Sequence, residues 1–347
     1  SSAEYFAFGA VKILDSLNIV DVICFGSECG SIEKMDIIAA VLADEPDDYK
    51  QLLKASLSKG LSFPAARQEA LSVYLKENSC YHDQHDLSNI LESSNNILGI
   101  EYLKALRRLN SSITPMTIRR TGSSYNSAEL SGKFSSATSI RNIIAKHGWN
   151  DGLRLLDNIL PEKTLEILRR EFEAGRGPVL PDDFSMLILS SLRKMTKEEL
   201  RNLPYMEYGL YNRFKAAAEK SGSFEELLDS IATKRYPVTR IQRILFSLLT
   251  GLNNDMLNEF NKTGGPSYIR ILGFNNTGRE LLQKIKDRTT LPIITKAADF
   301  KNSQIPRVSS MLSIEAAASD QYVLAFRKSE LRKSGSEFTR NIFYKNI

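Results

Sequence analysis

The sequence has little of what marks a secreted, membrane-bound or metal-stabilised protein. It has three cysteines, Cys24, Cys29 and Cys80, and this odd number without paired spacing indicates reduced thiols rather than a disulfide framework. No stretch approaches the roughly 20 apolar residues that span a bilayer, and no basic segment followed by an apolar one opens the chain. We therefore expect a cytoplasmic protein that makes no contact with a membrane.

The two commonest phosphate-binding motifs are also missing. The chain has no Gly-x-x-x-x-Gly-Lys loop and no Gly-x-Gly-x-x-Gly turn. His82 and His85 lie near Cys80, but the segment is polar and offers no second pair of soft ligands, so we expect no metal site there. His147 is expected to pack rather than to catalyse. The sequence thus names neither a metal ligand nor a catalytic residue.

What is present is typical of a folded protein with two domains. The chain has 347 residues, of which 42% are hydrophobic and 25% are charged, close to the averages for globular proteins. Its first residues include no initiator Met and run directly into an apolar-periodic segment. We therefore expect the chain to start inside a domain.

Charge is distributed unevenly, although the net charge is only +5. Residues 1–50 hold ten acidic and three basic side chains, whereas residues 102–150 hold eight basic side chains and one acidic one. Residues 230–254 hold four basic side chains and no acidic one. Two positive regions predict a bound polyanion, or a nucleotide site together with a polyanion site. A solvated basic face without a partner stays open as the alternative.

The first part of the chain alternates between helical and strand patterns. Residues 18–25 form a nearly continuous apolar run that ends at Gly26, which is typical of a strand buried on both faces. Helical spacing is found over residues 3–17, 32–42 and 95–109, and residues 113–120 are extended. This alternation predicts a layered α/β domain over residues 1–150.

The second part, residues 151–347, is expected to be mainly helical. Amphipathic helices are predicted over residues 153–159, 163–172, 184–192, 197–203, 209–218, 224–231 and 239–252. Two short apolar runs, 268–272 and 291–295, are expected to be strands packed on this helical body. The predicted fold class is therefore α/β followed by a mainly α-helical domain.

Candidate nucleotide contacts lie where the predicted strand and helix end or begin. Gly26 follows the strand, and its bare backbone allows a ligand to approach closely at the carboxyl end of a parallel sheet. Asn95 opens a helix and is a candidate for a base or ribose contact. Simpler roles stay open for both, a turn glycine and a helix N-cap.

Candidate phosphate contacts follow further along. Arg120 ends the extended segment, where a guanidinium suits phosphate oxygens, although Arg119 beside it leaves a one-residue ambiguity. Hydroxyl residues 135–139, including Ser139, lead into a helix whose first turn carries Arg141. Free N–H groups and a nearby arginine favour an anion there, and a well-capped helix is the equal alternative.

A second basic surface is predicted near residue 240. Arg240 and Arg243 lie one turn apart on a helix, opposite its apolar stripe, and Lys234 and Arg235 precede them. We expect these four residues to contact an RNA backbone, with Tyr236 either stacking on a base or packing under the turn.

Six motifs in sequence order resemble the tRNA(Met) cytidine acetate ligase family, and the resemblance runs from Ala3 to about Phe326. They are Phe25–Glu28, Asn95–Gly99, Arg120 with Tyr125, Ser136–Arg141, the basic residues between Lys234 and Arg243, and Tyr268–Gly273. The family is part of the nucleotidyltransferase superfamily with a His-x-Gly-His signature. The resemblance therefore implies a Rossmann-like nucleotidyltransferase domain.

The resemblance also implies an activity and its participants. ATP, with Mg²⁺, and acetate form acetyl-adenylate, and the acetyl group passes to N4 of the wobble cytidine of elongator tRNA(Met). Positions matching Gly26, Asn95 and Arg120 contact the nucleotide in the family, and the Ser-x-Thr-x-Ile-Arg stretch ending at Arg141 resembles the phosphate loop.

One departure from the family affects the expected activity. The first strand and the His-x-Gly-His turn have no counterpart here, so we expect this chain alone to lack adenylation activity. An adenylyltransferase for a small metabolite and a non-catalytic tRNA-binding module remain as alternatives.

Overall fold

The computed structural model describes residues 2–78, 89–121, 135–207, 209–305 and 307–345, and these form two compact units. The first unit comprises residues 1–121, 264–295 and 343–347, and the second comprises residues 122–263 and 296–342. This division does not follow the predicted boundary at residue 150. Segments from late in the sequence contribute to the first unit, and local periodicity carries no information about such long-range pairing.

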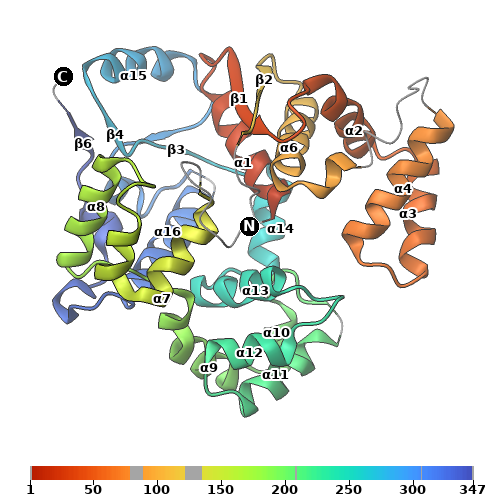
Figure 1. The fold of residues 1–347 in the computed structure, drawn as a ribbon. Coiled ribbons are helices and arrows are strands. Elements are labelled where there is room, and N and C mark those ends of the chain that lie inside the picture. Colours follow the sequence, from red (N-terminus) through yellow and green to blue (C-terminus); the bar gives the residue numbers. More distant parts are fainter. Residues whose placement is uncertain (1, 79–88, 122–134, 208, 306, 346–347) are drawn as a thin grey trace. The chain divides into compact units, whose positions relative to one another are not determined.

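The first unit is an α/β arrangement around two parallel strands (Figure 1). Its elements up to residue 121 are α1 (Ala3–Ser16), β1 (Val22–Ser27), α2 (Ile32–Asp44), α3 (Asp47–Ser58), α4 (Phe63–Asn78), η1 (Asn89–Glu92), α6 (Ser94–Arg108) and β2 (Thr114–Arg119). Strands β1 and β2 pair in parallel from Val22 opposite Thr114 to Ser27 opposite Arg119. The helix starts follow capping rules, since Ser2 and Ser31 accept hydrogen bonds from the first turns of α1 and α2.

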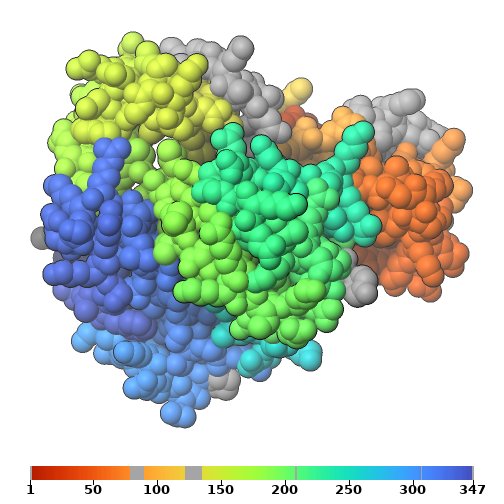
Figure 2. Space-filling view, turned by 90° about the horizontal axis from the view of Figure 1, so that it is seen from below, coloured from red at the N-terminus to blue at the C-terminus, as the bar shows by residue number. Residues whose placement is uncertain are grey.

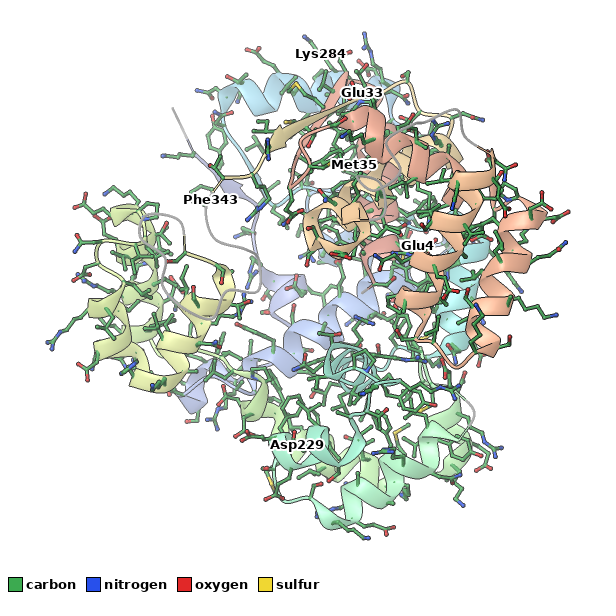
Figure 3. The ribbon with its side chains drawn as sticks, turned by 45° about the vertical axis from the view of Figure 1, so that its right-hand side comes forward. Glu4, Glu33, Met35, Asp229, Lys284 and Phe343 are labelled. Atoms are coloured by element: carbon green, nitrogen blue, oxygen red, sulfur yellow. The ribbon has the colours of Figure 1, made fainter. Side chains whose placement is uncertain are left out.

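One face of the β1–β2 pair packs on a helical core. Ile23 and Phe25 lie against buried residues of α1, α2 and α6, among them the fully buried Met35 labelled in Figure 3. Helix α6 approaches β1 closely at Gly99, where an added Cβ would lie 2.7 Å from Phe25 Cε2. A glycine is required there because any side chain would push α6 away from the strand.

Late segments complete the first unit. They are β3 (Ile269–Arg270), β4 (Gly273–Phe274), α15 (Asn276–Arg288), β5 (Ile293–Ile294) and β6 (Phe343–Tyr344). Strand β3 pairs in parallel with β5, and β4 pairs in parallel with β6. The two predicted strands at 268–272 and 291–295 therefore exist in shortened form. Their expected packing on the helical body is wrong, because they belong to the first unit.

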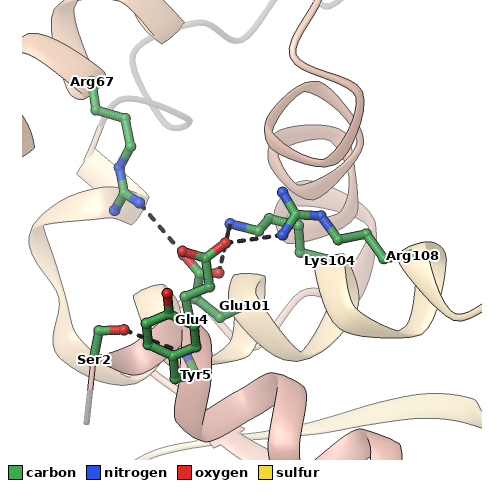
Figure 4. Close-up of polar contacts among 7 residues, drawn as sticks. All are labelled: Ser2, Glu4, Tyr5, Arg67, Glu101, Lys104 and Arg108. Carbon is green, nitrogen blue, oxygen red and sulfur yellow. Dashed lines mark hydrogen bonds and ion pairs between the residues drawn. The ribbon is translucent and has the colours of Figure 1, made fainter. Parts of the chain in front are cut away.

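A cluster of buried charges holds α1, α4 and α6 together (Figure 4). The ammonium of Lys104 lies 2.8 Å from Glu101 and 3.1 Å from Glu4, and Arg67 lies 3.5 Å from Glu101. Burial raises the pKa of Glu4, but attraction to Lys104 and hydrogen bonds from Lys104 and Arg108 outweigh it, so the pKa is lowered. The cluster fixes the position of α6, which carries Asn95 at its start.

The second unit is helical. Its elements are α7 (Ala137–Leu155), α8 (Glu162–Glu173), η2 (Pro181–Phe184), α9 (Ser185–Lys194), α10 (Lys197–Arg201), α11 (Leu210–Lys220), α12 (Phe224–Ile231), α13 (Val238–Thr250), α14 (Asn254–Lys262), η3 (Ala297–Phe300), α16 (Val308–Val323), η4 (Ser329–Leu331) and α17 (Ser336–Thr339). Helices α9 to α13 share one buried apolar core, and the green helices α9 to α12 form a continuous surface in Figure 2.

Most predicted helices of this unit are found within one to three residues of their expected limits. The exception is residues 153–159, because α7 ends at Leu155 and a turn follows. Among the described residues, no helix combines the length and the apolar character needed to cross a membrane.

Candidate functional site

The carboxyl edge of the β1–β2 pair brings two predicted nucleotide residues together. Gly26 lies opposite Ile118 and Ser27 lies opposite Arg119, so both strands end side by side. Arg120 follows β2, and its backbone N–H donates to the Ser27 carbonyl oxygen at 2.9 Å. An added Cβ on Gly26 would lie 3.2 Å from Arg120 Cγ. The Arg120 side chain therefore runs beside the bare backbone of Gly26.

Glu28 connects this edge to the start of α6. Its Oε1 accepts a hydrogen bond from Asn95 Nδ2 at 2.7 Å, and its Oε2 accepts one from the Asn96 backbone N–H at 2.9 Å. Because Glu28 comes two residues after Gly26, the predicted residues Gly26, Asn95 and Arg120 share one corner of the first unit. Glu28 was not among the predicted site residues, although it ends the Phe25–Glu28 motif and follows the strand-ending Gly-Ser pair directly.

Asn95 does not cap α6, which was the simpler role considered for it. The helix begins at Ser94, and the N-cap residue Ser93 makes no side-chain capping bond. The Glu28 carboxylate from another element accepts the first-turn N–H groups instead, and a negative charge is favoured at the positive end of a helix. The side-chain amide of Asn95 instead donates a hydrogen bond to Glu28 through Nδ2.

The backbone N–H groups of the turn after β1 are used within the protein. Asn96 Oδ1 accepts from the N–H groups of Glu28 and Cys29 at 2.8 and 3.0 Å. Ser27 Oγ accepts from the Gly30 N–H at 3.0 Å, and the Ser27 side chain is fully buried. This turn therefore offers no ready nest of free N–H groups to a phosphate, unlike the glycine-rich turns that bind dinucleotides.

Positive charge at the same edge comes from Arg119 and Arg120, which are both exposed. Within the ranges the structure describes, neither guanidinium has a carboxylate partner. Arg119 packs against Gly30, where an added Cβ would lie 2.8 Å from Arg119 Cβ, and Arg120 runs beside Gly26. Arg120 is therefore the arginine next to the predicted nucleotide contact, and its free fork suits phosphate oxygens.

The start of α7, in the second unit, is a well-capped helix. Ser136 Oγ accepts from the Ser139 N–H at 3.0 Å, and Ser139 Oγ donates to the Ser136 carbonyl at 2.8 Å. Ser139 is fully buried, so its hydroxyl serves its own turn. Arg141 is exposed, with its Nη2 at 3.4 Å from Thr138 Oγ1. Of the two predicted phosphate residues here, Arg141 is the one whose side chain reaches solvent.

The four predicted RNA-contacting residues meet in the turn before α13 and in its first two turns. Arg240 forms an ion pair with Glu207 at 2.8 Å and donates to the Tyr205 carbonyl at 2.7 Å, and Arg235 lies 3.4 Å from the same carboxylate. Lys234 is exposed. Residues 230–254 include no acid, but Glu207 comes from a preceding segment and partly neutralises this surface.

Aromatic rings lie against the same guanidinium groups. Arg235 and Arg240 lie 5.4 and 5.6 Å from the ring centre of Tyr236, and Arg243 lies 5.5 Å from that of Tyr205. Such stacking orients guanidinium groups over an aromatic face. Tyr236 is half-buried and packs against the core of the second unit. This is the simpler of its two predicted roles, packing under the turn.

One cavity lined by described residues of the first unit lies elsewhere. It has a volume of about 450 Å³ and lies beside the amino ends of β1 and β2, lined by Asp21, Ile113 and Lys284 among others. That edge is opposite to the one carrying Gly26 and Arg120. No group of three or more potential metal ligands is found among the described residues. Cys80, His82, His85 and Tyr125 lie outside the residues that the structure describes.

Comparisons with known proteins show the family to which the chain belongs. The family model described as HIGH Nucleotidyl Transferase matches residues 1–337. A protein of Acetivibrio thermocellus named tRNA(Met) cytidine acetate ligase is 46% identical over 99% of this chain and 81% of its own length. A protein of the same name from Caldanaerobacter subterraneus is 44% identical over 96% of this chain and 79% of its own length.

The chain is also similar to solved structures. Two crystal structures of Thermotoga maritima TmcAL, one apo and one bound with alpha-thio ATP, superpose with TM-scores of 0.92 and 0.90. Both are 32% identical in sequence to this chain, and each alignment covers 100% of this chain and 82% of the other.

Proposed function

Because the chain belongs to the tRNA(Met) cytidine acetate ligase family within the HIGH nucleotidyl transferases, we propose that it acetylates elongator tRNA(Met) at the expense of ATP. The observation that carries the proposal is the convergence of Gly26, Asn95 and Arg120 at the carboxyl edge of β1 and β2. Ligands of parallel α/β sheets bind at this edge. We also propose a cytoplasmic location, because the proposed reaction modifies tRNA.

The first proposed step activates acetate. An acetate oxygen attacks the α-phosphorus of ATP, which enters as its Mg²⁺ complex, and the bond to the bridging oxygen breaks, so that acetyl-adenylate forms and pyrophosphate leaves. Gly26 and Asn95 seat the adenosine. Arg120 attracts the phosphates, since a cation aimed at the developing charge lowers the barrier of such a transfer. The free guanidinium of Arg120 beside an exposed glycine backbone fits this role.

The second proposed step transfers the acetyl group. The N4 amine of the wobble cytidine attacks the acetyl carbon, loses a proton and releases AMP. The tRNA backbone is held by Lys234, Arg235, Arg240 and Arg243. Of these, Lys234 and Arg235 are the most exposed, and Arg235 keeps 74% of its side-chain surface in solvent. Long-range attraction by such cations supplies much of the affinity for nucleic acid and depends on salt.

The decisive experiment is acetate-dependent release of pyrophosphate from ATP by the full-length protein. We expect release with acetate, and transfer of acetyl to elongator tRNA(Met) when that tRNA is present. Release with another carboxylate or a phosphate ester, but none with acetate, would identify an adenylyltransferase for a small metabolite. Binding of tRNA without any release would identify a non-catalytic binding module. Either result would overturn the proposed reaction.

A further inference from the structure

The surroundings of Asn95 determine which way its side-chain amide faces. An asparagine amide has one donor end, Nδ2, and one acceptor end, Oδ1. Glu28 Oε1 lies 2.7 Å from Asn95 Nδ2 and 3.4 Å from the Asn95 backbone nitrogen. Because an ionised carboxylate only accepts hydrogen bonds, the donor end must face Glu28. The carbonyl oxygen Oδ1 therefore points away from Glu28.

Glu28 cannot easily turn to face Asn95 differently, since it is held from both sides. Its Oε2 accepts from the Asn96 N–H at 2.9 Å, and its own N–H donates to Asn96 Oδ1 at 2.8 Å. Asn96 is only 3% exposed, so this reciprocal pair is shielded from competing water. The pair joins the turn after β1 to the start of α6 across 68 residues of sequence.

We propose that Glu28 is a positioning residue of the nucleotide site, and that it presents Asn95 Oδ1 as a fixed acceptor to a hydrogen-bond donor of the nucleotide. This inference rests on the proposed function, because it needs the nucleoside at this corner. Adenosine carries suitable donors in its 6-amino group and its ribose hydroxyls. Hypoxanthine and guanine carry an acceptor oxygen in place of that amine.

The same carboxylate also directs the triphosphate. Glu28 occupies the positive end of α6, and the N–H groups of the turn after β1 are taken by Asn96 and Ser27. An anion is therefore repelled from this side of the corner. The guanidinium groups of Arg119 and Arg120, which have no carboxylate partner among the described residues, lie at the strand ends and attract it there. Glu28 thus separates the nucleoside side of the site from its phosphate side.

A merely structural role for Glu28 makes a different prediction, and a double-mutant cycle distinguishes the two. If Glu28 acts through Asn95, removing both side chains weakens ATP binding no more than removing Asn95 alone. If Glu28 only ties α6 to the turn, the losses multiply. The experiment measures ATP binding by calorimetry for the full-length protein, Glu28→Ala, Asn95→Ala and the double variant.

We expect each single substitution to weaken ATP binding about 3- to 10-fold, as for the loss of one hydrogen bond. The double variant should bind as Asn95→Ala does. Glu33→Ala is the matched control, because Glu33 lies in the first turn of α2, where its carboxylate accepts a hydrogen bond from Ser31 Oγ. If Glu28→Ala melts at a much lower temperature than the wild type, Glu28→Gln takes the place of Glu28→Ala in the cycle. The glutamine keeps one acceptor oxygen for the N–H groups of α6. Multiplied losses in the double variant would overturn the proposal.

Analogues then identify the donor. Purine riboside triphosphate lacks the 6-amino group, and 2′-deoxy-ATP and 3′-deoxy-ATP each lack one hydroxyl. One of them should bind the wild type about 3- to 10-fold more weakly than ATP, and should match ATP on Asn95→Ala. If all three match ATP on the wild type, no donor faces Asn95 and the proposal fails while ATP binding stands. If the wild type does not bind ATP at all, the proposed nucleotide site itself fails.

Discussion

The arginines at the β1–β2 edge and those before α13 are held in different ways. Arg119 and Arg120 have no carboxylate partner within the described part of the chain, whereas Arg235 and Arg240 share Glu207. Among the described residues, the first pair presents an uncompensated charge at a strand end, which suits a small and highly charged ligand. The second group is already oriented by an acid and by aromatic rings. A polyanion that binds there has to compete with Glu207.

This difference shows that counting basic residues along the sequence overestimates the charge that a surface offers. In the sequence, residues 102–150 hold eight basic side chains and residues 230–254 hold four. In the structure, their availability depends on acids from distant segments. Variants of buried, unpaired and acid-paired charges test this difference in availability.

Removal of a buried charge should have the largest effect. In Lys104→Met, Glu101 loses its closest cation, at 2.8 Å, while its side chain is only 4% exposed. Removing one partner of a buried ion pair costs about 3 kcal/mol or more, so the free energy of unfolding in urea should fall by about that amount. Lys163→Met is the control, because the pair of Lys163 and Glu166 is exposed and its loss should change stability by less than about 1 kcal/mol. Equal effects would contradict the buried cluster.

The two strand-end arginines should differ in their effect on ATP. Arg120→Ala removes the guanidinium beside Gly26, and the loss of a charge-assisted contact of about 1.5–3 kcal/mol should weaken ATP binding about 10- to 100-fold. Arg119→Ala serves as the control, since Arg119 packs on Gly30 instead and a smaller loss is expected. A larger loss in Arg119→Ala, measured by the same titration, would assign the phosphate contact to the neighbouring residue.

The surface before α13 should respond in both directions. Arg240→Ala combined with Arg243→Ala should weaken tRNA binding about 10-fold and reduce its dependence on salt concentration. Glu207→Gln should do the opposite and tighten binding about 3-fold, because it releases Arg235 and Arg240 from their shared acid. Filter binding at several salt concentrations measures both. Unchanged binding in the double variant would remove α13 from the proposed tRNA surface.

The smallest effect should be a change in acid stability. The pKa of Glu4 is lowered in the folded protein from its ordinary value of 4.5, so its ion pairs stabilise the fold above that pH. This contribution is lost as the pH falls below 4.5 through the folded-state pKa. Melting temperatures of the wild type and Glu4→Gln, measured from pH 6 to pH 3, should therefore converge at the acid end. A constant difference over that range would contradict the shift.

Local patterns predicted the first unit well where neighbours in sequence decide the structure. The helix from residue 95 to 109 and the extended segment 113–120 are found as α6 and β2, because apolar periodicity reflects the face that each buries. In the structure, Gly26, Asn95 and Arg120 lie at one corner of the first unit. Their roles in binding ATP remain a proposal.

The features that sequence reasoning missed all depend on distant partners. Glu28 bonds to residues 67 and 68 positions away, and Glu207 reaches Arg235 from 28 positions away. Local periodicity does not predict such pairs, because each member taken alone has the pattern of a solvent-exposed charged residue. The two predicted strands at 268–272 and 291–295 were assigned to the wrong unit for the same reason, because the two-residue strands β3 and β5 carry almost no pattern of their own.

The pairing of β4 with β6 also has a consequence for synthesis. Roughly 70 residues separate Phe274 from its partner segment at Phe343, and ribosomes add about 5–20 residues per second. The last strand of the first unit is therefore translated roughly 3–14 s after the strand it must meet. During that interval β4 lacks its partner strand, and the last segment of the helical unit, residues 296–342, is translated.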